Sequence, residues 1–418
     1  ELRDVFGTLS LEYDIADNAL LYARAAARDG DEAGLYGGIT VEDAATSAAT
    51  GSALFVPATT NNEAVEAGLR VKLGSTITHE FNFGGNANWQ VFRTAFDFLP
   101  GYATNLYATP QVPEPIGPGF VGGDIDDPNP TARTTLWSAF ASDTIGLFGD
   151  RVLLTGGLRL QTIRQENTNY DGTPGAIYDE NAVTPVAGIV IKPTERLSLY
   201  ANRIEALQQG PSVPVNPNNP TTNFGQSLPP RKSTQYEFGG KLGLGGMFLT
   251  LGAYRIDRPG EGVLPDGSFG YLGEQRHEGI EFTANGEIAP GLRLIGGAAL
   301  TDTEFVNGNE VPGVPEYTAN ANVEWDLGFV PGLTLTGRVV HTGEQFVDQA
   351  NTLELDSWTR FDLGARYVFA AAETPVTLRL SVDNVANERY WASAFDAFSP
   401  ALLQGGPRAV KASISADF

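Results

Sequence analysis

Cysteine is absent from the 418 residues, so disulfide bonds and cysteine-ligated metal sites are excluded. Histidine is also scarce: His79, His277 and His341 lie far apart in the sequence and form no metal-ligand motif. Basic residues are outnumbered, the net charge is −23, and no basic stripe is present, which argues against nucleic acid as a partner. The sequence therefore predicts neither a metal centre nor a nucleic-acid-binding protein.

Long apolar runs are missing as well. No stretch reaches the roughly 18 apolar residues that a membrane-spanning helix needs, and no charged-then-apolar signal segment precedes Val5. If the protein is exported, we expect its signal to have been removed or to lie outside this sequence. What the chain does contain is 42% apolar residues, 49 glycines and 26 prolines, with only 18% charged residues. This composition is too apolar for disorder and favours β-structure.

Apolar and polar residues alternate in many segments, which is typical of strands with two different faces. In 360–369, for example, one face carries Phe361, Leu363, Ala365, Tyr367 and Phe369, and the other carries Arg360, Asp362, Gly364, Arg366 and Val368. The same reasoning predicts 17 strands, approximately at 5–14, 19–28, 63–73, 75–97, 131–146, 150–165, 181–192, 196–206, 231–244, 247–258, 272–288, 291–304, 315–327, 332–343, 356–369, 375–387 and 408–417. Many have about ten residues or more, enough for a tilted strand to cross a bilayer and longer than the roughly 5–6 of soluble domains.

The connections between these strands alternate between short and long without a break. The long ones are 29–62, 98–130, 166–180, 207–230, 259–271, 305–314, 344–355 and 388–407. A soluble β-sandwich has no reason to sort its loops in this way, whereas a membrane barrel has tight periplasmic turns and long extracellular loops. The predicted fold class is therefore all-β, a transmembrane antiparallel β-barrel.

Charge placement supports the same fold without proving it. Strands 356–369 and 375–387 keep every charge opposite their apolar face, as expected where a lipid-facing Lys or Arg costs about 2–4 kcal/mol. Aromatic residues near strand ends, such as Tyr13 and Tyr367, fit interfacial girdles. Soluble sheets also segregate charge, so a soluble or secreted β-sandwich binding module stays open as an alternative.

Strand parity indicates that the barrel is incomplete. Bacterial single-chain barrels have an even number of strands with both ends on the periplasmic side, whereas 17 is odd. An open barrel would expose unpaired backbone groups to lipid. We therefore expect at least one further strand before residue 5, so that the sequence is a fragment.

Several segments carry a more specific pattern: Asp383-Asn384-Val385-Ala386-Asn387-Glu388-Arg389-Tyr390-Trp391, Gly405-Gly406-Pro407-Arg408-Ala409-Val410, the closing strand that ends at Phe418, 228–241, 273–281, and Asn105-Leu106-Tyr107 followed by Pro110 and Pro113. Together, over nearly the whole chain from about Val5 to Phe418, they resemble TonB-dependent outer-membrane siderophore receptors. Tyr200-Ala201-Asn202 and Gln208-Gln209-Gly210-Pro211 resemble the ferrichrome and coprogen branch.

This resemblance implies a barrel of 22 strands around a plugged lumen, of which about 17 are present and five absent. Residues 1–418 are then one β-barrel domain, truncated at its N-terminus and lacking the plug domain and the TonB box. The resemblance also implies a location in the outer membrane of a Gram-negative bacterium, among lipid and lipopolysaccharide. It further implies that the terminal aromatic, Phe418, is the signal read by the barrel-assembly machinery.

The implied function is active import of ferric siderophores into the periplasm, driven by the TonB-ExbB-ExbD complex through the missing N-terminal region. The ferric siderophore is cargo, and no cofactor is expected. A passive porin and a receptor for cobalamin, haem or glycan remain alternatives. No serine lies in a nucleophile elbow and no acid–base constellation stands out, so no catalytic residue is assigned and the chain is not expected to be an enzyme.

Ligand contacts are expected from aromatic residues of the long loops, because they offer rigid apolar area with a polar handle. The candidates are Trp89, Tyr102, Tyr107, Phe269, Tyr271, Trp391, Phe395 and Phe398. Each could instead pack within its own loop or mark the outer aromatic belt. Arg133 and Arg276 are candidates for pairing with an anionic ferric complex, although arginines of this kind more often pair with neighbouring carboxylates.

Overall fold

A computed structural model describes residues 2–108, 119–213, 221–396 and 400–416. The regular secondary-structure elements of these residues are all β-strands. None of the described residues forms a helix long and apolar enough to cross a membrane. The chain divides into unit 1, residues 1–145 and 156–185, and unit 2, residues 146–155 and 186–418. The two units are described separately below.

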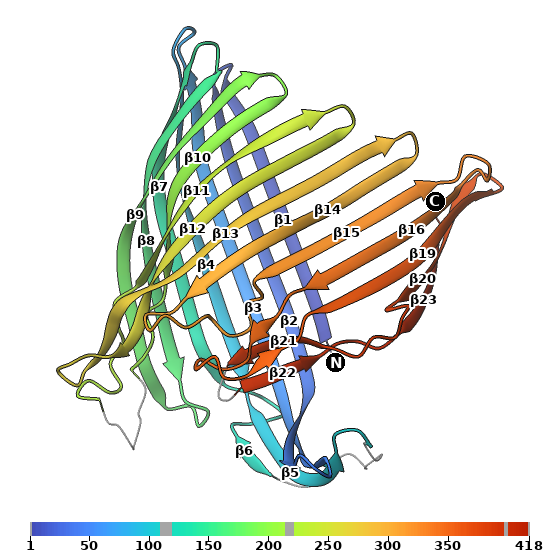
Figure 1. Cartoon of the computed structure of the whole chain (residues 1–418). Helices are drawn as coiled ribbons and strands as arrows, with labels where there is room; N and C mark the ends of the chain where they lie inside the picture. Colours follow the sequence, from blue (N-terminus) through green and yellow to red (C-terminus); the bar gives the residue numbers. More distant parts are fainter. Residues whose placement is uncertain (1, 109–118, 214–220, 397–399, 417–418) are drawn as a thin grey trace. The chain divides into compact units, whose positions relative to one another are not determined.

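Unit 1 is a set of long antiparallel strands. Its strands are β1 (Leu2–Ala16), β2 (Ala19–Asp43), β3 (Ala48–Leu73), β4 (Thr78–Thr94), β5 (Phe96–Asn105) and β6 (Phe120–Gly122). Further strands, divided between the two units, are β7 (Pro130–Leu147), β8 (Val152–Thr168) and β9 (Pro174–Thr194). β1, β2, β3 and β4 pair in succession, β5 pairs with the far part of β3, and β6 pairs with β5 (Figure 1).

The longest hairpin corrects one expectation. β2 and β3 stay in register from Ala19 opposite Val71 to Val41 opposite Ala49, and after a register shift Asp43 pairs with Ala48. The prediction of a loop at 29–62 is therefore wrong. The far half of β3 still alternates in burial, but the residues on its buried side, Ala49, Gly51 and Ala53, are small and give no period-two apolar signal in the sequence. The far half of β2 is mostly exposed, so no alternation marks it either.

Unit 2 is an antiparallel meander. Its long strands are β10 (Leu197–Gln208), β11 (Arg231–Leu244), β12 (Met247–Val263), β13 (Phe269–Ala289), β14 (Leu292–Glu304), β15 (Tyr317–Asp326), β16 (Leu333–Thr342), β19 (Trp358–Ala371), β20 (Thr374–Asp383) and β23 (Ala409–Ala416). Each pairs with the next in this order (Figure 1). Two small hairpins lie in the long loops: β17 (Gln345–Phe346) with β18 (Glu354–Leu355), and β21 (Trp391–Asp396) with β22 (Pro400–Gln404).

All 17 predicted strands coincide with strands of the structure, which confirms the all-β antiparallel assignment. The structure has 23 strands among its described residues, because β5, β6, β17, β18, β21 and β22 form inside segments that were expected to be loops. These six strands are short or pair beyond the apolar part of the sheet. They therefore lack the long alternating pattern on which the prediction depended.

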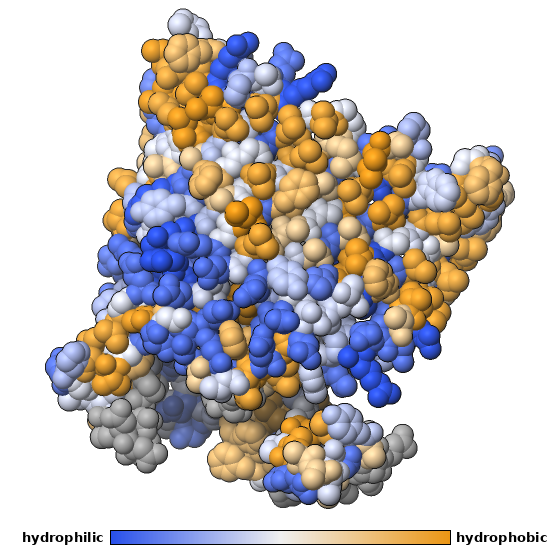
Figure 2. All heavy atoms as spheres, in the orientation of Figure 1, coloured by the Kyte–Doolittle hydropathy of each residue, from blue (hydrophilic) through white to orange (hydrophobic). Residues whose placement is uncertain are grey.

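The sheet of unit 2 has two chemically different faces. Phe238, Ala253, Ile280 and Leu300 are opposite one another in successive strand pairs, and Phe238 and Leu300 are 65% and 60% exposed. We call this side the apolar face and the opposite side, which carries Glu237 and Tyr254 among others, the polar face. Figure 2 shows hydrophobic side chains gathered around the short turns of this unit, with hydrophilic ones toward the long-loop ends. Apolar exposure on this scale indicates a surface that lipid or a partner covers.

Candidate functional site

The long loops of unit 2 pack into one small layer. Asn351 and Glu310 exchange hydrogen bonds, with the Glu310 amide 2.7 Å from Asn351 Oδ1. The Ala394 amide donates to Gln345 Oε1 at 3.3 Å, and Val347, Leu355 and Ala394 form a buried apolar cluster. The loops 305–316 and 343–357 and the β21–β22 hairpin are therefore held together by their own core.

Two predicted ligand aromatics are carried by this layer. Trp391 and Phe395 belong to β21 and are 38% and 51% exposed, so both present surface that a ligand could contact. Their strand is anchored through Ala394, which is 3% exposed. Phe398 and Phe418 lie outside the described residues.

Three predicted aromatics belong to unit 1 and differ in their surroundings. Trp89 lies in β4 opposite Glu63 and is 42% exposed. Tyr107 follows β5 and is 81% exposed. Tyr102 instead packs its ring over Gly51 in the paired strand, where a Cβ would clash with it. Tyr102 therefore contributes to its own sheet, as the alternative interpretation of these aromatics expects.

The remaining two predicted aromatics lie at the loop between β12 and β13. The backbone of Phe269 is held by the Asn223 side chain, through hydrogen bonds of 2.9 Å in both directions. The Tyr271 hydroxyl donates to the Pro229 carbonyl at 2.5 Å. Tyr271 is also close enough to Arg258 to interact with it electrostatically. Tyr271 thus has a positively charged neighbour that could share a ligand with it.

A group of basic side chains on the polar face was not predicted. Arg231 begins β11, and Arg258 and His277 lie opposite Gln275 and Ile256 in the β12–β13 pair. Arg231 and Arg258 are near enough to repel each other, and Arg258 acts in the same way on His277. We call Arg231, Arg258 and His277 the basic cluster.

Only one carboxylate balances this cluster among the described residues. Arg231, with its side chain 11% exposed, forms an ion pair with Glu261, which a register shift between Pro259 and Glu261 brings alongside. No carboxylate of the described chain lies within ion-pairing distance of Arg258. The His277 ring contacts the Gln275 amide at 2.9 Å.

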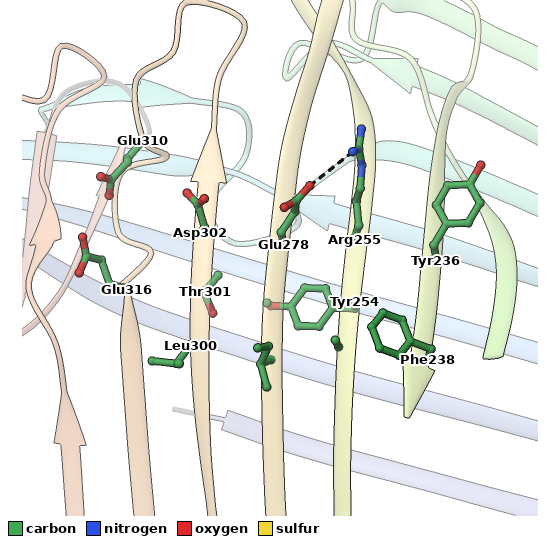
Figure 3. A pocket seen from close by; sticks show the side chains of 13 residues that line it. Tyr236, Phe238, Tyr254, Arg255, Glu278, Leu300, Thr301, Asp302, Glu310 and Glu316 are labelled. Carbon is green, nitrogen blue, oxygen red and sulfur yellow. Dashed lines mark ion pairs between the residues drawn. The ribbon is translucent and has the colours of Figure 1, made fainter. Parts of the chain in front are cut away.

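A depression of about 620 Å³ lies where the apolar face ends at the loops of β12–β15 (Figure 3). We call it the rim pocket. Its apolar part includes Phe238, Ile280 and Leu300, and its charged part is formed by Arg255, Glu278, Asp302, Glu310 and Glu316. Partial burial, followed by the charges of Glu316, Asp302 and Glu354, raises the pKa of Glu310. The pocket therefore disfavours further negative charge.

The two arginines proposed to pair with an anionic ferric complex have different surroundings. Arg276 lies on the apolar-face side, with Glu278 at 3.5 Å and Asp257 and Glu304 at 3.8 Å. It is paired with neighbouring carboxylates, as the alternative expected. Arg133 is exposed on β7. No group of three or more His, Asp or Glu side chains in the described ranges is arranged to hold a metal ion.

Comparison with known proteins identifies close counterparts. A family model described as "TonB dependent receptor-like, beta-barrel" matches residues 3–385. The ferrichrome receptor FcuA of Yersinia enterocolitica is 37% identical over the whole chain, which covers 56% of that relative. The probable TonB-dependent siderophore receptor PiuA of Acinetobacter baumannii is 25% identical over 93% of this chain and 57% of its own length.

Solved structures agree with these sequence matches. The crystal structure of BauA, the ferric preacinetobactin receptor of Acinetobacter baumannii, superimposes with a TM-score of 0.84 at 28% identity, over 100% of this chain and 63% of that one. The structure of PiuA gives a TM-score of 0.79 at 20% identity over 100% of this chain and 64% of its own. The chain spans somewhat more than half the length of the relatives it matches.

Proposed function

Because this chain belongs to the family of TonB-dependent receptor β-barrels, we propose that it is the barrel of an outer-membrane receptor that imports ferric siderophores into the periplasm. The family consists of transport receptors rather than enzymes, and it places the chain in the outer membrane of a Gram-negative bacterium. In such a barrel the apolar face contacts lipid and the polar face lines the lumen.

The observation that carries the proposal is the 37% identity to a ferrichrome receptor along the entire chain. The match covers 100% of the chain, so it includes the long loops, and loops are where ligand specificity is usually carried. BauA and PiuA, which are also named for siderophores, have the same fold. A porin relationship would not account for three siderophore receptors among the matches.

We propose that residues 1–418 form one barrel domain of a longer receptor, since the chain covers 56% and 57% of its curated relatives. Gating and energy coupling through TonB-ExbB-ExbD would then depend on a plug and a TonB-contacting segment outside these residues. The exposed aromatics of the long loops, Trp89, Tyr107, Trp391 and Phe395 among them, would contact the ferric complex. Phe269, Tyr271 and Phe398 complete that proposed set.

Two further partners follow from the position of the chain in the membrane. The rim pocket combines an apolar part with a charged part, and we propose that it contacts lipopolysaccharide in the outer leaflet, where acyl chains meet charged headgroups. Phe418, as the C-terminal aromatic, is proposed as the signal for the barrel-assembly machinery. Neither partner bears on the choice of cargo.

The test is uptake of radioactive iron under iron limitation, comparing a deletion strain with the same strain carrying the complete gene. Ferrichrome is the first cargo, and haem and cobalamin serve as alternative cargoes. We expect complementation to restore ferric siderophore uptake, and a strain without TonB to abolish it. Equal siderophore uptake with and without the gene would refute the proposal, and uptake that persists without TonB would indicate a passive porin.

A further inference from the structure

The basic cluster lies at the mouth of the barrel rather than within the membrane. Arg258 is eleven residues beyond Met247, the first residue of β12. At about 3.3 Å per residue and a strand tilt near 40°, this places it roughly 28 Å from the short-turn end, beyond an apolar band about 25 Å tall. Arg231 lies three residues beyond Thr234, which pairs with Asp257, so it is at least as far from the short turn. His277 lies opposite Ile256, two residues nearer that turn and close to the edge of the apolar band. The cluster therefore faces the lumen where an incoming ligand first enters.

The cluster is also electrostatically incomplete. The Nε atoms of Arg231 and Arg258 are both buried and have no hydrogen-bond partner within the described chain, as is also true of Arg276, so the shortage of carboxylates is what distinguishes the cluster. Arg258 has no ion pair there, and Arg231 has Glu261 alone. Two guanidinium groups held together in partial burial are unfavourable unless negative charge balances them. This arrangement occurs in a chain whose net charge is −23, so a shortage of available carboxylates does not explain it.

We infer that the basic cluster is a subsite for a negatively charged ferric complex, an inference that rests on the proposed function and narrows its substrate class. Arginine fits this task because its planar donors bind carboxylate or catecholate oxygens in pairs. Gln275 and the nearby Tyr271 ring add an amide and an aromatic surface to the same place.

The inference separates two classes of siderophore. Three hydroxamates neutralise Fe³⁺ and give an uncharged complex, whereas three catecholates give a trianion. An uncharged complex gains little from two guanidinium groups, and an anionic one gains their full attraction at a low-dielectric wall. The receptor should therefore bind anionic ferric complexes more tightly than neutral ones, and Arg258 should account for the difference.

The experiment uses the complete receptor in outer membranes, with ferrichrome as the neutral probe and ferric enterobactin as the tris-catecholate probe. Dissociation constants are measured by quenching of intrinsic fluorescence for the wild type and for Arg258→Gln. The matched control is Arg276→Gln, which removes the same charge from the opposite face of the paired strand. We expect Arg258→Gln to weaken binding of the trianion about tenfold or more and that of ferrichrome less than about twofold, while Arg276→Gln changes neither.

Each other outcome contradicts the inference in a distinct way. If Arg258→Gln weakens both probes equally, the residue acts on loop structure and not on ligand charge. If it leaves both unchanged, and barrel assembly falls instead, the cluster pairs with another part of the receptor. If the wild type binds neither probe, the proposed function fails and the subsite fails with it. Tight binding of ferrichrome alone would support the proposed function and overturn the anionic subsite.

Discussion

The rim pocket and the basic cluster are built by the same strands, β11 to β13, at the same end, yet their charges are arranged in opposite ways. On the apolar-face side, Arg255 has Asp257 at 2.9 Å and Glu278 at 3.4 Å, and Arg276 has three carboxylates within 4 Å. On the polar face, Arg231 pairs with Glu261, and Arg258 has no ion pair with any described residue. The arginines on the apolar-face side each have several carboxylate partners, whereas the arginines of the basic cluster outnumber the carboxylates that pair with them.

The difference shows that the role of a charged residue depends on which face of the sheet it lies on, because successive residues of a strand point to opposite faces. Arg276 and His277 are neighbours in sequence, but Arg276 lies on the apolar-face side and His277 on the polar face. Arg276 is paired with carboxylates, whereas Arg258 on the polar face has no ion pair with a described residue. A well-formed pocket is therefore not by itself evidence of a ligand site.

The strongest test of the face assignment is to place a charge on the apolar face. Leu251 lies there, 55% exposed and opposite Phe282, four residues from the short turn and thus near the middle of the bilayer. We expect Leu251→Arg to destabilise the barrel by about 2–4 kcal/mol, because the guanidinium would face hydrocarbon. The measurement is the urea midpoint of unfolding for receptor in lipid vesicles.

The control for this change is the adjacent residue, Thr250, which faces the lumen on the same strand. Thr250→Arg adds the same charge at the same depth, so we expect a loss of less than about 1 kcal/mol. Equal losses for the two variants would mean that the two faces have been assigned wrongly.

A smaller effect sharpens the comparison between the two arginines. Arg276→Gln removes several partly exposed ion pairs and should lower stability without ligand by about 0.2–1 kcal/mol. Arg258→Gln removes a charge that lacks a carboxylate, so stability should be unchanged or slightly higher. Urea unfolding of the ligand-free receptor measures both. A larger loss for Arg258→Gln than for Arg276→Gln would show that Arg258 has a structural partner.

The fold could be read from the sequence where strands cross the membrane, because lipid on one side imposes a period of two. The segment 360–369 shows this, and β19 forms there. Beyond the membrane that constraint is absent, so the sequence pattern predicts a loop at the far halves of β2 and β3. The hairpins β17–β18 and β21–β22 depend on a small core of Val347, Leu355 and Ala394 from separate loops, which no local pattern reveals.

The site could be predicted only in part. Tyr271 was identified because it is an aromatic residue in a long loop, and it does lie near a charged group. Arg258 was missed because its neighbours come from cross-strand register and from the irregularity between Pro259 and Glu261. Arg276 was considered for the ligand because a sequence does not show which carboxylates lie across the strand pair. Parity counted from Met247 would have placed Arg258 on the polar face.

The smallest expected effect concerns the acid-rich side, at Glu310 (Figure 3). Burial and then the charges of Glu316, Asp302 and Glu354 raise its pKa, so the folded state binds this proton more tightly than the unfolded state does. Stability therefore falls as pH rises from the unfolded pKa, near 4.3, through the folded pKa, and the penalty is complete above both. Glu310→Gln should stabilise the receptor at pH 7 by less than about 1 kcal/mol, since the side chain is largely solvated. The gain should vanish below about pH 4.

Urea midpoints at both pH values measure this gain, with Glu373→Gln in the short turn between β19 and β20 as the control for net charge. A gain that persists at low pH, or an equal gain from the control, would show that repulsion within the rim pocket is not its cause.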